Sequence, residues 1–148
     1  MKKLLLFSLF AVNICKAQSI DDFLSAAFPT SLTASPDGKS IAWVFNDKGL
    51  RNVFTAASPS FAANRITAYM EDDGMEISNL QFTPDGSQLV FVRGNANNNN
   101  GEPANPAFLQ TSTARNIWIV GNDGKNLRKI VAGSYYKISP DGKTMAYS

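Results

Sequence analysis

The chain has 148 residues, and its 44% hydrophobic content is that of an ordinary globular protein rather than of a disordered or membrane-embedded one. It contains no histidine and a single cysteine. A catalytic triad with a histidine base and an internal disulfide framework are therefore excluded within this sequence.

The first 17 residues have the pattern of a secretory signal peptide. Met1-Lys2-Lys3 is a short positive region, the run from Leu4 to Val12 is apolar, and Cys15-Lys16-Ala17 places small residues at positions −3 and −1. The apolar run is too short for a membrane span, which needs about 20 residues. Ile14 is too bulky for a lipoprotein signal. We therefore predict cleavage after Ala17 and export to the periplasm or the medium.

Cleavage changes the charge of the chain. It removes three of the 14 basic residues and the cysteine, leaving 11 basic and 12 acidic residues, a net charge of −1. The isoelectric point of 8.7 for the whole sequence thus does not describe the mature protein. A nearly neutral domain offers no electrostatic argument for binding nucleic acid or anionic membrane, and without cysteine it has no thiol nucleophile or thiolate metal site.

Residues 18–30 are expected to form a short helix and a linker. Ser19 with Asp22 three residues later resembles a capping box. Phe23, Leu24 and Ala27 then supply an apolar side, and Pro29 is expected to end the helix.

A five-residue turn recurs three times in the rest of the chain. Its serine or threonine, proline, aspartate and glycine suit the successive positions of a type I turn that closes a three-residue hairpin. The copies are Ser35-Pro36-Asp37-Gly38-Lys39, Thr83-Pro84-Asp85-Gly86-Ser87 and Ser139-Pro140-Asp141-Gly142-Lys143.

Apolar residues alternate at matching positions on both sides of each turn, which indicates strands. A third element repeats as well, since Arg51-Asn52-Val53-Phe54 matches Arg115-Asn116-Ile117-Trp118, and Ile66 and Ile130 mark a fourth. Four strands per unit of about 40 to 50 residues is typical of a propeller blade. The sequence therefore predicts an all-β chain in which residues 31–148 form about two and a half blades, at about 31–70, 77–132 and from 134 onward.

Residues 94–114 are an insertion between the second and third strands of the second unit. The segment is rich in asparagine, glycine and proline, a composition that buries little apolar surface, so we expect a mobile loop that is dispensable for folding.

Candidate chemistry is sparse. The acidic stretch Glu71-Asp72-Asp73-Gly74 with Glu76 has the carboxylates to hold a hard cation or a substrate ammonium, but its spacing departs from the calcium-loop pattern, and a solvated loop between blades is the favoured interpretation. Trp43 and Trp118, taken as analogous strand positions, are interpreted as core anchors rather than sugar-stacking residues. No catalytic, metal-binding or cofactor-binding residue is assigned, no cofactor is expected, and substrate-binding residues are left unknown.

Several segments resemble the N-terminal propeller of bacterial serine peptidases of the prolyl oligopeptidase family, in the dipeptidyl aminopeptidase and acylaminoacyl peptidase branch. They are Ala42-Trp43-Val44-Phe45-Asn46-Asp47, Arg51-Asn52, Glu71-Asp72-Asp73-Gly74-Met75-Glu76-Ile77-Ser78, and Phe82 to Gly86 continuing through Val92-Arg93-Gly94. The resemblance implies a propeller that restricts access to a C-terminal α/β-hydrolase domain acting on oligopeptides.

None of the family's catalytic positions lies within residues 1–148, so the chain itself is expected to be inactive. The main alternative is a non-enzymatic propeller like that of the periplasmic protein TolB, which uses the same Pro-Asp-Gly turns and binds protein partners. A carbohydrate- or metal-binding propeller lyase is a third reading. Peptide specificity, total blade number and oligomeric state are left open by the sequence.

Overall fold

The computed structural model describes Ile20 and residues 27–148, and it is all-β with antiparallel strands. The predicted signal peptide and most of the expected helix lie outside these residues. Strand order follows chain order in each of two four-stranded sheets and in a final hairpin. The first sheet contains β1 (Phe28–Ala34), β2 (Ser40–Asp47), β3 (Leu50–Ala57) and β4 (Asn64–Arg65). The second contains β5 (Ile77–Phe82), β6 (Gln88–Arg93), β7 (Asn116–Gly121) and β8 (Arg128–Ala132), and the hairpin contains β9 (Tyr136–Ile138) and β10 (Met145–Tyr147).

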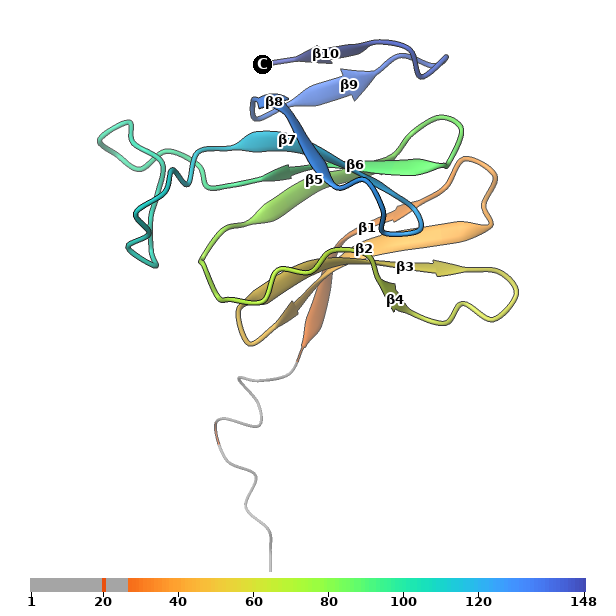
Figure 1. Cartoon of the computed structure of the whole chain (residues 1–148), viewed down its shortest axis with the longest axis horizontal. Coiled ribbons are helices and arrows are strands. Elements are labelled where there is room, and N and C mark those ends of the chain that lie inside the picture. The colour runs from red at the N-terminus through yellow and green to blue at the C-terminus, as the bar shows by residue number, and fades with distance from the viewer. Residues whose placement is uncertain (1–19, 21–26) are drawn as a thin grey trace, which may run out of the picture.

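The three sheets lie one above another in chain order (Figure 1). This arrangement agrees with part of a propeller, and within residues 27–148 the stack does not close into a ring. β1 begins at Phe28 and includes Pro29, so a strand starts directly after the segment in which the helix is expected. A proline is tolerated there because β1 is at the edge of its sheet.

The three predicted turns share one hydrogen-bond pattern. In the first, the Ser35 hydroxyl donates to the Asp37 carboxylate at 2.6 Å and accepts from the Ser40 amide at 2.9 Å, while Gly38 takes a φ of +68°. The same contacts recur in the second turn with Thr83, Asp85 and Gln88, and in the third with Ser139, Asp141 and Thr144. Each turn thus fixes the register of the hairpin that it closes.

One hydrophobic cluster fills the space between the first and second sheets. Its buried members come from both sheets: Ala42, Val44, Val53 and Ile66 from the first unit, and Ile77, Leu80, Phe82, Leu89, Phe91 and Val120 from the second. A second cluster, of Val90, Val92, Ile117, Ile119 and Tyr136, lies between the second sheet and the hairpin. Both faces of the second sheet are therefore covered, as its apolar runs predict.

In the second sheet and in the hairpin, the residue six positions before the turn glycine packs against the preceding sheet. Leu80 does so with 8% of its surface exposed, and Tyr136 does so with 7%. The Tyr136 hydroxyl donates to the carbonyl oxygens of Asn79 and, at 2.7 Å, Val90, and burial raises the pKa of this hydroxyl. The equivalent Leu32 is 71% exposed because no sheet precedes the first among the described residues.

Trp43 and Trp118 are not counterparts, contrary to the sequence interpretation. Trp43 lies in β2 and is paired with Phe54 of β3, whereas Trp118 lies in β7, a third strand, and is paired with Phe91 of β6. Trp43 stacks on Phe54 with ring centroids 5.9 Å apart. Each sheet thus has one tryptophan–phenylalanine pair across its two central strands, and the two residues have exchanged strands. Trp118 is partly buried and packs against the cluster between the first two sheets, whereas Trp43 and Phe54 belong to neither described buried cluster.

The insertion is anchored at its base, in contrast to the expectation for the whole segment. Asn95 and Thr113 are buried, and the backbone N–H of Asn95 donates to the backbone carbonyl of Thr113 at 2.8 Å. Gly94, with a φ of +130°, brings the two arms so close that a Cβ there would lie 2.5 Å from the Ala114 carbonyl oxygen. Composition alone did not reveal these contacts because backbone groups and one asparagine make them.

Candidate functional site

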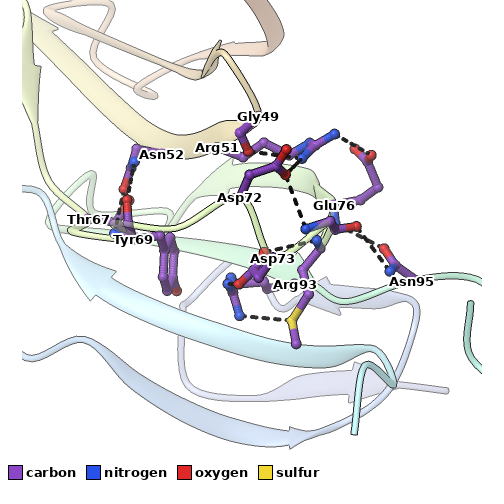
Figure 2. A network of polar contacts seen from close by, with 12 residues as sticks. Gly49, Arg51, Asn52, Thr67, Tyr69, Asp72, Asp73, Glu76, Arg93 and Asn95 are labelled. Carbon is purple, nitrogen blue, oxygen red and sulfur yellow. Dashed lines mark hydrogen bonds and ion pairs between the residues drawn. The ribbon is translucent and has the colours of Figure 1, made fainter. Parts of the chain in front are cut away.

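The strongest concentration of charged and polar contacts lies at the junction of the first two sheets (Figure 2). It is built around the crossover of residues 66–76, which runs from β4 of the first sheet to β5 of the second. This crossover contains the acidic stretch that the sequence singled out.

Asn52 of β3 holds the first half of the crossover. Its side chain is buried, its Nδ2 donates to the Tyr69 carbonyl at 2.9 Å, and its Oδ1 accepts from the Tyr69 amide at 2.8 Å and from the Thr67 hydroxyl at 2.9 Å. The Thr67 hydroxyl in turn accepts from the Val53 amide at 2.9 Å. The side chain of Asn52 therefore holds the crossover alongside β3 beyond the point where strand β4 ends.

Arg51, the residue before Asn52, forms ion pairs with two carboxylates of the crossover. Its guanidinium nitrogens lie 3.6 Å from the Asp72 carboxylate and 3.3 Å from that of Glu76, and Nη1 donates to the Gly49 carbonyl at 3.0 Å. Both carboxylate side chains are 59% exposed. Pairs this exposed contribute little stability individually, about 0 to 1 kcal/mol.

Arg93, at the end of β6, makes the more buried pair with Asp73. The two side chains are 12% and 21% exposed. The guanidinium carbon also lies 3.9 Å from the centroid of the Tyr69 ring, and Nη1 lies 3.0 Å from the sulfur of Met75. Burial is the main cause that raises the pKa of the Tyr69 hydroxyl; Arg93 opposes it and Asp73 adds to it. A guanidinium held by a carboxylate on one side and a ring on the other is strongly oriented.

Asn95 connects the crossover to the insertion. Its Nδ2 donates to the carbonyl oxygens of Gly74 and Ala104, at 3.1 and 2.8 Å, and its Oδ1 accepts from the Glu76 amide at 3.1 Å. The ring of Pro106 fills the space beside Gly74. The crossover, the first two sheets and the insertion thus form one connected unit.

The ion pairs of Arg51 and Arg93 with the crossover carboxylates join the first two sheets, and we call these residues the clamp. Their geometry is not that of a reaction centre. Asp72, Asp73 and Glu76 each face a guanidinium, and Glu71 is exposed. Within the residues that the structure describes, no group of three or more acidic, histidine or cysteine side chains is placed to hold a metal ion. The sequence singled out the acidic residues, but it did not show that Arg51 and Arg93 neutralise them. The signal available in the sequence was that Arg51 and Arg93 each lie at the end of a predicted strand; which carboxylates they meet depends on how the sheets stack.

Among the described residues, no helix is both long and apolar enough to cross a membrane.

Comparison with known proteins gives a likeness in fold alone. No family model matches the sequence, and no curated protein matches it. One similar solved structure is an acylaminoacyl peptidase in complex with Z-Gly-Gly-Phe-chloromethyl ketone, with a TM-score of 0.52 and 15% identity over 79% of this chain. Another is the acylaminoacyl peptidase of Pyrococcus horikoshii, with a TM-score of 0.47 and 14% identity over 74% of this chain. The chain spans only 20% and 18% of these two proteins, respectively.

Proposed function

We propose that this chain is the N-terminal propeller portion of an exported serine peptidase that cleaves short peptides, of the dipeptidyl or acylaminoacyl type. In the intact protein, a C-terminal α/β-hydrolase domain supplies the catalytic residues, and the propeller limits which oligopeptides reach it. Export follows from the signal peptide read in residues 1–17, and cleavage after Ala17 gives a mature protein that begins at Gln18.

The observation that carries the proposal is the stack, in chain order, of two four-stranded sheets and a hairpin, in each of which the same turn joins the first two strands. A peptidase propeller shares this fold over most of the chain, at a TM-score of 0.52. The segment Glu71 to Ser78, which resembles the peptidase family, supports it further because it forms the clamp between the first two sheets. A stiff junction between blades is what a cap needs if it is to exclude large substrates, since a loose ring admits them.

A fluorophosphonate probe, which labels the activated serine of serine hydrolases, tests the proposal on the intact exported protein. We expect labelling, together with hydrolysis of chromogenic dipeptidyl or acyl-aminoacyl substrates. Absence of both would favour the TolB-like alternative, in which the propeller binds protein partners and catalyses nothing.

The gating role has its own test. Replacement Arg93→Met removes the buried pair with Asp73, so we expect cleavage of long peptides to rise relative to short ones. Lys125→Met is the matched control, because its pair with Asp123 lies on the surface, where the lysine side chain is 78% exposed. An unchanged ratio of long to short peptide cleavage in Arg93→Met would argue against gating through this junction.

A further inference from the structure

Arg115 is the counterpart of Arg51 in the second unit, but its surroundings differ. Both arginines are followed by an asparagine that begins or continues the third strand of a sheet. In the first unit the crossover to the next sheet supplies two carboxylates to the arginine. In the second unit the crossover between β8 and β9 consists of residues 133–135, Gly-Ser-Tyr, which carry no carboxylate.

The guanidinium of Arg115 has no ion pair among the residues that the structure describes. Its Nε is buried and has no hydrogen-bond partner there. A buried donor without a hydrogen-bond partner carries a free-energy cost, which is larger when the group is charged. The site is therefore incomplete as it stands, and an acceptor placed at this guanidinium would remove that cost.

A hollow of about 400 Å³ adjoins Arg115 and has room for such an acceptor. It lies between the base of the insertion and the short crossover. Its lining includes Asn95, Asn97, Arg115, Gly133, Ser134 and Ser148. No acidic side chain is among these lining residues, and Arg115 contributes the one charged side chain of the lining.

We propose that Arg115 and this hollow form a binding site for a carboxylate. The equivalent arginine shows which chemistry this position accepts, since Arg51 binds the carboxylates of Asp72 and Glu76. A guanidinium presents a planar fork of donors that matches a carboxylate in two-point contact. The carboxylate comes either from the C-terminus of a bound peptide or from an acidic side chain of the intact protein. This inference stands whether or not the intact protein is a peptidase.

The test follows the Nε–H resonance of Arg115 in the intact protein, labelled with ¹⁵N-arginine, because this signal reports on the one site. N-acetyl-Ala-Ala with a free carboxylate is titrated against its C-terminal amide. We expect the acid to shift the resonance and to bind at least about tenfold more tightly than the amide, a difference of about 1.4 kcal/mol. Arg115→Lys keeps the charge but loses the fork, and it should bind the acid about tenfold more weakly, whereas Arg128→Gln, an exposed arginine of β8, should leave binding unchanged.

A second experiment tests whether an acidic side chain of the intact protein occupies the site. If an acidic side chain of the intact protein occupies the site, the peptide acid does not bind, and Arg115→Gln lowers the Tm by several degrees more than Arg128→Gln does. Either result supports the proposal. It is overturned if the peptide acid and amide bind equally or not at all while the two glutamine variants melt alike, or if inorganic phosphate binds more tightly than the peptide acid.

Discussion

Replacement of Asn52 by alanine tests whether one buried asparagine holds the crossover between the first two sheets. The side chain makes three hydrogen bonds to Tyr69 and Thr67, of 2.8 to 2.9 Å. A typical hydrogen bond contributes about 0.5 to 1.5 kcal/mol net, so loss of three predicts a cost of about 2 to 4 kcal/mol. The upper part of this range applies if the freed groups of Tyr69 stay out of water.

The matched control is Asn116→Ala, at the equivalent position of the second sheet. Asn116 makes a single side-chain hydrogen bond, from Nδ2 to the Ala114 carbonyl at 2.7 Å, and it is only partly buried. Its replacement should cost about 1 kcal/mol. The two substitutions remove the same atoms, so their difference measures the crossover contacts and not the loss of an asparagine as such.

Two measurements on the intact protein check this prediction. Urea unfolding gives the change in the free energy of unfolding for each variant. Hydrogen exchange of a peptide covering residues 66–76 reports on the crossover itself, and protection of the Tyr69 amide should fall by about thirtyfold in Asn52→Ala if about 2 kcal/mol is lost locally. An effect of Asn52→Ala no larger than that of Asn116→Ala, with unchanged exchange at Tyr69, would refute the reasoning.

Three further predictions follow from the same structure. Leu80→Ala should lower the free energy of unfolding by about 2 to 5 kcal/mol, because it leaves a cavity between the first two sheets. Leu32→Ala should cost the same in the intact protein if the proposed propeller covers the first sheet. A cost below about 0.5 kcal/mol for Leu32→Ala in urea unfolding would contradict closure of the ring. Gly94→Ala should cost more than about 3 kcal/mol of stability, because the added Cβ meets the backbone of the opposite arm of the insertion. Gly101→Ala, at the open tip of the insertion, should cost about 1 kcal/mol through its positive φ alone. Equal midpoints of the two variants in a thermal melt would show that the base is not tightly closed. The Asp85 carboxyl, held by hydrogen bonds from its own turn, should titrate at about 2 rather than 3.8, so its stabilisation of the turn is complete above pH 3.8 and is lost as the pH falls toward 2; a titration by carbonyl ¹³C NMR that gives an ordinary value would reject this account.

The turns and the strand periodicity could be predicted from the sequence because both are local. A serine or threonine, a proline, an aspartate and a glycine at fixed spacing satisfy their own hydrogen bonds within six residues, as the contacts of Ser35 and Asp37 show. Alternating apolar residues beside each turn then define strands and four-stranded units. The sequence therefore determined the all-β class and the order of its strands.

Contacts between distant residues were decided only by the tertiary structure. Nothing in the acidic stretch indicates that Arg51 and Arg93 neutralise it, because these residues lie about 20 positions before and after it and meet it only when the sheets stack. The same holds for Asn95. The asparagine, glycine and proline around it suggested a mobile loop, although its side chain bridges the crossover and the insertion. Local sequence patterns predict the hydrogen bonds that a segment makes within itself. Ion pairs and buried side-chain contacts across sheets depend on packing that brings separate segments together, and the positions of Arg51, Arg93 and Asn95 in the junction were fixed at that level.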